Sequence, residues 1–364
     1  MKKRLALIFG GRSGEHEISI ISARSIAQAI PRTRYEVIPI YITKEGKWLS
    51  RALSQKVLLL DYEQLIKNPT ELRAAEASLK DAAARHSFKF DFSTFDVVFP
   101  VLHGTFGEDG TIQGLLEIHG VPYVGCGVLA SALTMDKAFA KLCFKAAGLR
   151  VAKYLTVFRD ALPAHRRDIL LEAEQKLGYP MFIKPARSGS SVGISKVKHR
   201  RAFQQALELA AQYDQKILIE QGIEARELEV AVLGNRDLTV SVVGEIVPVN
   251  EFYDYEAKYV KSGSKLFIPA DVPAALAKKI QRAAQIAYRA TGCEGMARAD
   301  FFLERHTNRL YINELNSIPG FTSISMYPKL FAASGLAYPD LLERLIALAF
   351  ERYEEQQKNK IAFL

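Results

Sequence analysis

Cysteine and long apolar runs are scarce in this chain of 364 residues, and each absence excludes a class of protein. The three cysteines, Cys126, Cys143 and Cys293, are odd in number and widely spaced, and no Cys-x-x-Cys pair occurs. They predict neither a disulfide framework nor a zinc site, and they favour a reducing compartment. No run approaches the roughly 18 apolar residues that a membrane-spanning helix needs.

The amino terminus has only a short apolar run. Basic residues at positions 2–4 precede Leu5–Phe9, but this run is five residues long and ends at Gly10. The apolar core of a signal peptide has about 7–15 residues. We therefore expect a cytoplasmic protein that does not associate with membranes.

The overall composition is that of a globular protein, with 49% apolar and 24% charged residues. Such values exclude a disordered chain, a coiled coil and a small disulfide scaffold. At roughly 150 residues per domain, the length predicts two or three domains. No internal repeat is apparent.

The charge is uneven. The chain has 49 basic and 40 acidic residues, hence a net charge of +9, which raises nucleic acid, a membrane surface or a phosphorylated ligand as partners. Residues 137–216 hold 16 Lys and Arg against 6 Asp and Glu, so this segment carries +10 and the remainder −1. By itself this charge does not choose among the three kinds of partner. A nucleic-acid-binding protein would also need clustered aromatic residues or a recognition helix, and neither is found.

Apolar patterns predict an α/β protein that begins with a parallel sheet covered on both sides. In the first third we expect strands at Leu5–Phe9, Tyr35–Ile42 and Asp96–Leu102, helices at Ile18–Ile30 and Ile112–Ile118, and helix with a break at Pro69 within Arg51–Phe90. Beyond it we expect helices at Lys137–Ala147, Pro273–Thr291 and Pro339–Phe350, and strands at Tyr179–Lys184, Ile217–Glu220, Leu228–Val232, Leu238–Val243, Ala299–Leu303 and Leu310–Leu315. The strand pair on either side of Gly234 suits a hairpin. The long aromatic segment Asn250–Phe267 is typical of a functional lid.

Acidic residues near the carboxyl end favour a metal site. Glu314 and Asn316 lie two residues apart on an expected strand and therefore share a face. Asp300, on the preceding expected strand, could face them. Two carboxylates and a carboxamide oxygen are hard ligands that suit Mg²⁺ held together with phosphates. The alternative is a solvated acidic face.

Lys184 opens a loop of small residues that ends at Gly193 and could close around phosphate oxygens. It is not a Walker loop, because the lysine precedes the glycines, and a plain flexible loop is the alternative. Lys137, on the preceding helix, is a second candidate for phosphate. At the end of the next strand, Glu220–Ile223 could bind the amino edge of adenine, and Glu227 could reach a ribose hydroxyl.

The amino-terminal turn Gly10–Glu17 is rich in glycine but lacks the Gly-x-Gly-x-x-Gly spacing, which argues against a nicotinamide-dependent oxidoreductase. Glu15 at this turn could instead receive a cationic substrate group. A second polar turn, His103–Gly110, follows a strand, and open α/β sheets bind ligands at such strand ends.

Five ordered blocks of the sequence resemble the D-alanine–D-alanine ligases of the ATP-grasp superfamily. The blocks are Gly10–Ser19, His103–Gly110, Lys184–Gly193, Phe252–Tyr259 and Glu314–Ser323. The resemblance implies a three-domain ATP-grasp architecture: a substrate-binding domain at residues 1–134, a central subdomain at 135–222 and a carboxyl-terminal subdomain with catalytic and metal residues at 223–364. ATP would lie between the last two.

The resemblance also implies roles for individual residues. ATP would contact Lys137, Lys184, Ser190, Ser191, Glu220, Gln221, Ile223, Glu227, Lys258, Asn313 and Glu314. Two Mg²⁺ or Mn²⁺ ions would bind Asp300, Glu314 and Asn316. The catalytic residues would be Glu15, Ser190, Tyr259, Arg298 and Gly320. D-alanine would meet Glu15, His103, Ser325 and Met326.

The implied reaction makes D-alanyl-D-alanine for peptidoglycan. ATP would convert the carboxylate of the first D-alanine into an acyl phosphate, and the amine of the second would attack it through an oxyanion that faces Arg298 and the Gly320 backbone. Tyr259 favours D-alanine as nucleophile, whereas Phe at this place accompanies relatives that use D-lactate, which is the near alternative. His103 is a candidate base, although an orienting role is the more common one for such a residue. The family implies a homodimer.

Overall fold

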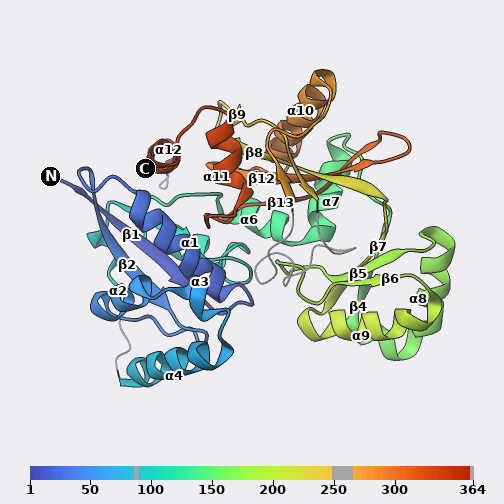
Figure 1. Cartoon of the computed structure of the whole chain (residues 1–364), viewed down its shortest axis with the longest axis horizontal. Coiled ribbons are helices and arrows are strands. Elements are labelled where there is room, and N and C mark those ends of the chain that lie inside the picture. Colours follow the sequence, from blue (N-terminus) through green and yellow to red (C-terminus); the bar gives the residue numbers. More distant parts are fainter. Residues whose placement is uncertain (86–89, 248–264, 361–364) are drawn as a thin grey trace.

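The computed structural model describes residues 1–85, 90–247 and 265–360, which form three β-sheets flanked by helices (Figure 1). The strands are β1 (Lys3–Gly10), β2 (Tyr35–Ile42), β3 (Val97–Val101), β4 (Tyr154–Phe158), β5 (Met181–Pro185), β6 (Ser195–Val197), β7 (Lys216–Gln221), β8 (Ala225–Leu233), β9 (Thr239–Val240), β10 (Gly244–Val247), β11 (Lys265–Phe267), β12 (Met296–Glu304) and β13 (Leu310–Asn316). The helices are α1 (His16–Ala29), α2 (Arg51–Leu59), α3 (Tyr62–Leu65), α4 (Pro69–Arg85), α5 (Thr111–Ile118), α6 (Val128–Met135), α7 (Lys137–Ala146), α8 (Leu162–Lys176), α9 (Phe203–Tyr213), α10 (Ala274–Ala290), α11 (Met326–Ala333) and α12 (Tyr338–Gln356).

The first sheet is parallel, as the sequence predicted, with strand order β2-β1-β3. Successive residues of a strand point to opposite faces. Leu5 and Leu7 of β1 belong to a core that also includes α1 and α12 residues. Ala6 and Ile8 belong to a core on the other face, which α5 completes with Ile112. Both faces are therefore buried, as expected for a parallel sheet.

The second sheet is antiparallel, with order β4-β7-β5-β6, and packs on α8 and α9 around a core of its own. The expected strands at Tyr179–Lys184 and Ile217–Glu220 are confirmed as β5 and β7. The sequence did not predict β4, β6 or the two helices. Figure 1 shows this green sheet at one end of the molecule and the blue first sheet at the other.

The third sheet has order β11-β10-β8-β12-β13, with β9 also beside β8. The expected hairpin around Gly234 is present, because Val232 pairs with Val240. The prediction that its second strand runs to Val243 is wrong. Ser241 accepts the Ala231 N–H through its side chain, and its own carbonyl accepts a hydrogen bond from Gln281, so the ladder ends there.

Helices α6 and α7 contribute to the core of the third sheet, to which α10 also belongs. Two expected helices are confirmed as α10 and α12, and α12 extends six residues beyond the expected end at Phe350. The expected break at Pro69 is confirmed, because α3 ends at Leu65 and Pro69 begins α4, a position where its missing N–H costs nothing. The boundaries expected for three domains stay predictions.

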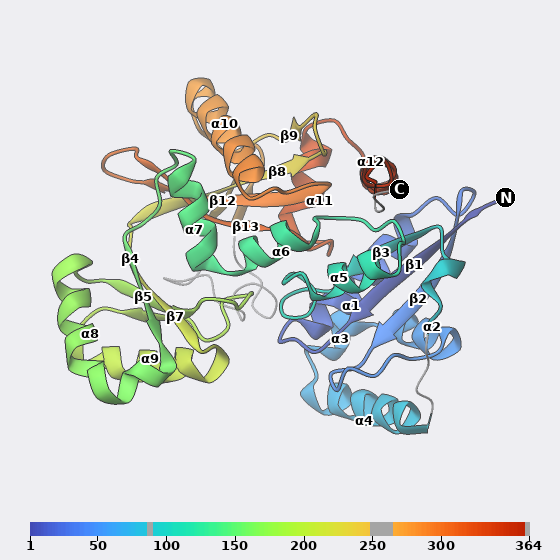
Figure 2. The same ribbon diagram turned by 180° about the vertical axis from the view of Figure 1, so that it is seen from behind.

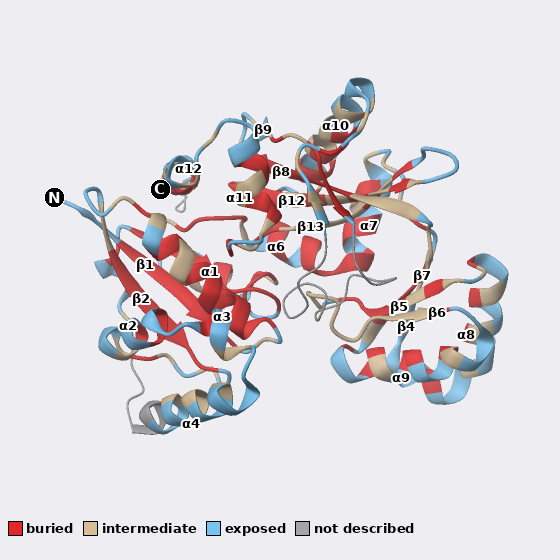
Figure 3. Cartoon of the chain, in the orientation of Figure 1, coloured by how far each residue is buried: buried red, intermediate tan, exposed pale blue. Residues whose placement is uncertain are grey.

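One core joins the first and third sheets. It combines apolar residues of β1, β3, β8, α1, α11 and α12. The two chain ends lie on the same side of the molecule in Figures 1 and 2. Figure 3 shows the strands of the first sheet buried, with exposed residues on the outer faces of α4 and α12. Among the described helices, none combines the length and apolarity needed to cross a membrane.

Residues 250–264, which make up most of the expected lid, lie outside the described residues. The last three residues of the expected lid form β11, which pairs antiparallel with β10 at one edge of the third sheet. Lys258 and Tyr259, both singled out from the sequence, fall in the part that is not described.

Candidate active site

Two carboxylates face each other across the antiparallel strands β12 and β13. Asp300 lies directly opposite Glu314, and Arg298 lies opposite Asn316, which confirms the expected shared face. Like charges in direct opposition destabilise a sheet, so such a pair requires positive charge nearby. Arg298 supplies it: its guanidinium donates to both Asp300 oxygens at 2.7 and 2.6 Å.

Further charges surround this pair. Arg298 Nε also lies 3.0 Å from Glu229 Oε2 on β8, and Lys137 Nζ on α7 lies 3.6 Å from Glu314 Oε2. Burial lowers the pKa of Arg298, but Asp300 and Glu229 outweigh it and raise that pKa well above its usual range. Sequence reasoning missed Glu229. The only indication of Glu229 in the sequence is that a carboxylate stands within a run of apolar residues, which the structure buries on β8.

The residues present fit a divalent cation that prefers oxygen ligands. Asp300 and Glu314 offer carboxylate oxygens, and Asn316 Nδ2 lies 3.1 Å from Asp300 Oδ2. The assignment of amide nitrogen and oxygen follows hydrogen bonding, so a cation would favour the flipped carboxamide. Among the described residues, no three His, Cys, Asp or Glu side chains form a metal site by themselves. Mg²⁺ suits such an incomplete set, because it keeps waters and takes phosphate oxygens.

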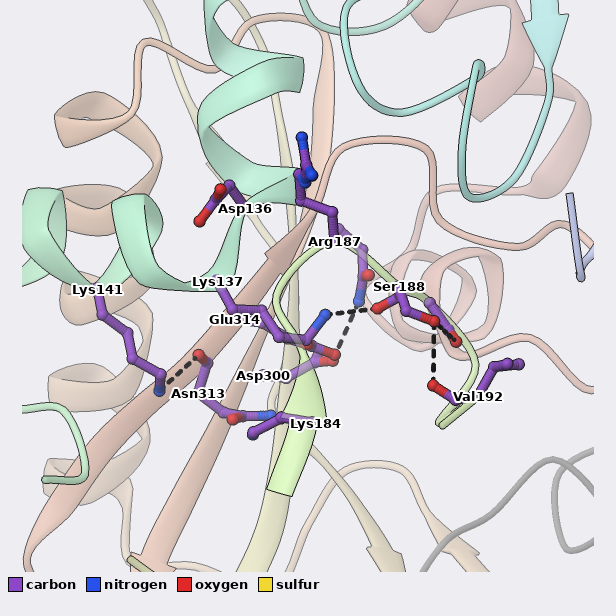
Figure 4. A network of polar contacts seen from close by, with 12 residues as sticks. Asp136, Lys137, Lys141, Lys184, Arg187, Ser188, Val192, Asp300, Asn313 and Glu314 are labelled. Carbon is purple, nitrogen blue, oxygen red and sulfur yellow. Dashed lines mark hydrogen bonds and ion pairs between the residues drawn. The ribbon is translucent and has the colours of Figure 1, made fainter. Parts of the chain in front are cut away.

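Three lysines lie beside these carboxylates, as Figure 4 shows. Lys137 donates to Ser188 O at 2.6 Å. Lys184, at the end of β5, forms an ion pair with Glu220 on β7. Lys141 forms an ion pair with the second oxygen of Glu220. Sequence reasoning missed Lys141, whose signal was its position one helical turn after Lys137 on α7.

The residues expected to meet adenosine surround the end of β7. Glu220 is buried, and Gln221 donates its N–H to Lys153 O at 2.9 Å, so this strand end is fixed by the backbone. The next position must be glycine, because a Cβ on Gly222 would lie 2.7 Å from Pro180 O. Ile223 is half-buried at the connection to β8, and Glu227 follows on β8.

The loop after Lys184 approaches the amino-terminal turn. Ser190 and Ser191 have φ of 45° and 61°, a conformation that is costly outside glycine and concentrates at functional sites. Ser190 Oγ donates to Glu15 Oε1. A Cβ on Gly189 would lie 2.1 Å from Glu15 Oε2, so only glycine permits this approach. The second sheet and the first sheet thus meet at Glu15.

Glu15 also contacts the second glycine-rich turn. Ser13 Oγ accepts the Glu15 N–H at 3.1 Å and donates to His103 O at 2.7 Å. Gly104 has a φ of 75°, and a Cβ there would lie 3.0 Å from Glu15 Oε2. The two turns singled out from the sequence therefore form a single surface around the Glu15 carboxylate.

His103 connects the first sheet to the loop that follows β13. Its Nδ1 lies 3.0 Å from Ile318 O and its Nε2 lies 3.1 Å from Ser22 Oγ, which accepts the Phe321 N–H at 3.3 Å. Ile318 O can only accept, so Nδ1 carries the proton, and in the neutral ring Nε2 accepts from Ser22 Oγ. Burial lowers the pKa of His103, so the ring is neutral and holds the loop in place.

Glu108 is a second connection that sequence reasoning missed, although it lies in the turn that was singled out. Its oxygens accept the Gly104 N–H at 2.8 Å and the Ile318 N–H at 3.1 Å. Burial and the nearby Glu15 raise the pKa of Glu108 to about 8. With His103, this carboxyl group satisfies both backbone polar groups of Ile318.

The remaining described residues that were expected at the site are Gly320 and Ser325, in the loop after β13, and Met326, which begins α11. A Cβ on Gly320 would lie 2.7 Å from Ser325 Oγ, which accepts the Thr322 N–H at 3.0 Å. Ser325 therefore stabilises the conformation of this loop and lies at the end of the loop. The Met326 side chain is buried, with its Cε directed at Gly244 of β10, so its expected contact with substrate remains a prediction.

Two family models match this chain, one in its first third and one in the rest. Residues 4–126 match the family model described as D-ala D-ala ligase N-terminus, and residues 143–347 match D-ala D-ala ligase C-terminus. Together the two models cover most of the chain. These ranges include the segments that contain Glu15, His103, Lys184 and Arg298. They also include the site residues that follow Arg298 in the chain.

Individual relatives extend over nearly the whole chain. A D-alanine–D-alanine ligase of Chloroherpeton thalassium is 58% identical over 99% of this chain and 100% of its own length, and one of Caldicellulosiruptor bescii is 49% identical over 99% and 98%. Two solved structures are similar: the VanG D-Ala:D-Ser ligase of Enterococcus faecalis (36% identity, TM-score 0.78, 96% of this chain and 100% of that one) and the D-alanine–D-alanine ligase of Coxiella burnetii (35%, 0.79, 98% and 96%). The chain belongs to the D-alanine–D-alanine ligase family.

Proposed function

We propose that this chain joins two D-alanine molecules with ATP, forming D-alanyl-D-alanine for peptidoglycan precursors, ADP and phosphate. One observation carries the proposal beyond family membership: three sheets contribute chemically different groups to one place. Glu15 comes from the first sheet, Lys184 and its loop come from the second, and the opposed Asp300 and Glu314 come from the third.

The nucleotide would lie between the second and third sheets. Lys184 and Lys137 would contact its phosphates, aided by the Ser190 and Ser191 backbone, and Glu220 to Ile223 with Glu227 would bind adenosine. Asn313 and Glu314 would close the site from β13. Asp300, Glu314 and Asn316 would hold two Mg²⁺ or Mn²⁺ ions, which neutralise phosphate charge in such sites. Lys258, outside the described residues, is assigned to the γ-phosphate.

Glu15 would receive the ammonium of the first D-alanine. The carboxylate is fixed, since Ser190 donates to one oxygen while Gly189 and Gly104 pack against the other. A positioned carboxylate aligns the substrate carboxylate with the phosphate that it must attack. Such alignment can supply several kcal/mol of a reaction barrier, on the order of 7–11 in the best cases. The product of this step is an acyl phosphate of D-alanine.

The second D-alanine would attack that acyl phosphate near Arg298. The developing oxyanion would face the Arg298 guanidinium and the Gly320 backbone N–H, and a donor of this kind contributes about 3–4 kcal/mol in comparable sites. Ser325 and Met326 would line the acceptor pocket. His103 would orient this loop and would not act as the base, because its ring nitrogens bond Ile318 O and Ser22 Oγ.

The test incubates purified protein with ATP, MgCl₂ and D-alanine. A coupled assay monitors ADP release, and mass spectrometry measures the mass of the product. We expect ADP release that depends on D-alanine and a product with the mass of the dipeptide. Glu314→Gln should abolish turnover while the unfolding midpoint stays close to that of the wild type. Absence of D-alanine-dependent ADP would refute the proposal.

The acceptor is tested in the same assay with D-serine and D-lactate offered beside D-alanine. The wild type should form mainly D-alanyl-D-alanine, and Tyr259→Phe should move product toward the D-lactate ester. We further propose a cytoplasmic homodimer organised as the three domains expected from the sequence. Light scattering after gel filtration and limited proteolysis test the dimer and the domain boundaries.

A further inference from the structure

Lys141 is a buried cation to which nothing above assigns a role. It lies on α7, four residues after Lys137, and its side chain is 1% exposed. Its ammonium forms an ion pair with Glu220 Oε1 and donates to Asn313 O on β13 at 3.3 Å. An ammonium group in such a place is costly unless it is paired and hydrogen-bonded, and Lys141 is both. The side chain thus connects α7, β7 and β13.

Glu220 lies between two ammonium groups. Its other oxygen forms an ion pair with Lys184, and the carboxylate is 2% exposed. Lys184 is also the lysine that opens the phosphate loop. A lysine drawn toward phosphate leaves its earlier partner, and a buried carboxylate that loses its only cation is strongly destabilised. Glu220 avoids this loss only if Lys141 stays.

The two lysines differ in their freedom to move. Lys141 is held by Asn313 O as well as by Glu220, whereas Lys184 stands at the end of β5 where the loop begins. Burial raises the pKa of Glu220, but Lys141 and Lys184 outweigh it and lower that pKa. The other ionisable groups nearby are Tyr154 and Glu314.

We propose that Lys141 is a positioning residue that keeps Glu220 ionised and in place as the acceptor for the nucleobase amino group, while Lys184 serves the phosphates. This inference rests on the proposed function, because the proposed phosphate site determines the direction in which Lys184 moves. A carboxylate accepts a hydrogen bond from the exocyclic amine of adenine, and it repels the carbonyl oxygen that guanine presents at the same place. Lys141 would therefore help to determine nucleotide selectivity.

The first arm measures nucleotide binding by calorimetry with ATP and GTP at several pH values. Lys141→Met should weaken ATP binding about tenfold or more, as expected for loss of a charged hydrogen-bond partner. The variant should also lower the ratio of ATP affinity to GTP affinity. This ratio should fall further at lower pH, because a protonated Glu220 can donate to the guanine carbonyl. Lys145→Met is the matched control: Lys145 is exposed on the same helix, and its loss should change neither value.

The second arm uses the protein without nucleotide and so does not depend on the proposed function. Lys141→Met should lower the unfolding midpoint, and adding Glu220→Gln should restore part of it, because the carboxylate with too few cations is gone. Lys141→Arg keeps the charge and should keep most of the selectivity.

The outcomes separate the two ideas. A wild type that binds no ATP refutes the proposed function and with it the role in nucleotide selectivity, and the nucleotide-free arm then decides whether Lys141 keeps Glu220 ionised. A wild type that binds ATP beside a Lys141→Met variant with the affinities of Lys145→Met overturns the inference. Failure of Glu220→Gln to restore stability also overturns it.

Discussion

Gly189→Ala isolates one contact of the candidate active site. The added Cβ would lie 2.1 Å from Glu15 Oε2 and 3.0 Å from Glu15 Cδ. Ordinary van der Waals separation needs more than about 3 Å, so the loop or the carboxylate must move by about 1 Å. Gly189 does not have a positive φ, so alanine introduces no backbone strain that would confuse the result.

A displacement of that size affects catalysis more than stability. Misplacing a substrate-binding group by about 1 Å costs roughly 100-fold in rate, equivalent to about 2.7 kcal/mol. The loop is half-buried and can shift outward, so we expect the free energy of unfolding to change by less than about 1 kcal/mol. The prediction is a loss of about 100-fold in kcat/KM for D-alanine with a nearly unchanged Tm.

Gly114→Ala is the matched control. No atom lies within 4 Å of its added Cβ, and Gly114 is in α5, where alanine stabilises a helix by about 0.5–1 kcal/mol over glycine. Activity should be unaffected. Adding Glu15→Asp to Gly189→Ala should cost less than the product of the two separate losses, because the shorter side chain relieves the overlap. A Gly189→Ala variant within about threefold of wild-type kcat/KM would show that the contact does not position substrate.

Three further predictions concern the connections between the sheets. The raised pKa of Glu108 means that part of the folding stability is present below the ordinary glutamate pKa near 4.5 and is lost as pH rises toward about 8. In urea titrations, the stability difference between wild type and Glu108→Gln should follow this pH course. A stability difference that is independent of pH would contradict the prediction. Ser22→Ala removes the hydroxyl between His103 and the Phe321 N–H and should lower kcat by about tenfold with little change in ATP binding, whereas equal effects on both would argue against a role in placing the loop. Arg352→Met leaves two buried carbonyls, of Tyr123 and Gly125, without their donor and should lower the free energy of unfolding by about 3 kcal/mol in chemical denaturation, and a change below about 1 kcal/mol would refute this reading of the contact.

Local patterns were enough to predict the parallel first sheet and the face shared by Glu314 and Asn316. Both depend on alternation along a single strand, which a sequence displays directly. The helix α8 was missed because few of its 15 residues, among them Leu162 and Ile169, are buried, so charged residues obscure its apolar side. Strand β6 has three residues, which is too short for a pattern.

The connections between elements were beyond the sequence. Glu108 and Ile318 are 210 residues apart, and nothing local indicates that the carboxyl group accepts that particular N–H. The same holds for Lys141 and Glu220. The packing of α7 on the third sheet brings them together, although β7 belongs to the second.

Part of the charge excess in residues 137–216 also has a structural explanation. Lys216 pairs with Asp136, Lys137 lies near Glu314, and Lys184 pairs with Glu220. All three carboxylates lie outside that segment, so the excess is partly neutralised in space even though it is not neutralised along the chain.

The core that joins the first and third sheets has a consequence for biosynthesis. Leu5 of β1 and Leu345 of α12 are both completely buried in it, so residues from opposite ends of the chain complete one apolar interior. A ribosome delivers β1 long before it delivers α12. The second sheet, whose described core residues all fall within 155–219, can close while synthesis continues. The first strand must therefore wait, with its apolar face uncovered, until α12 has been delivered.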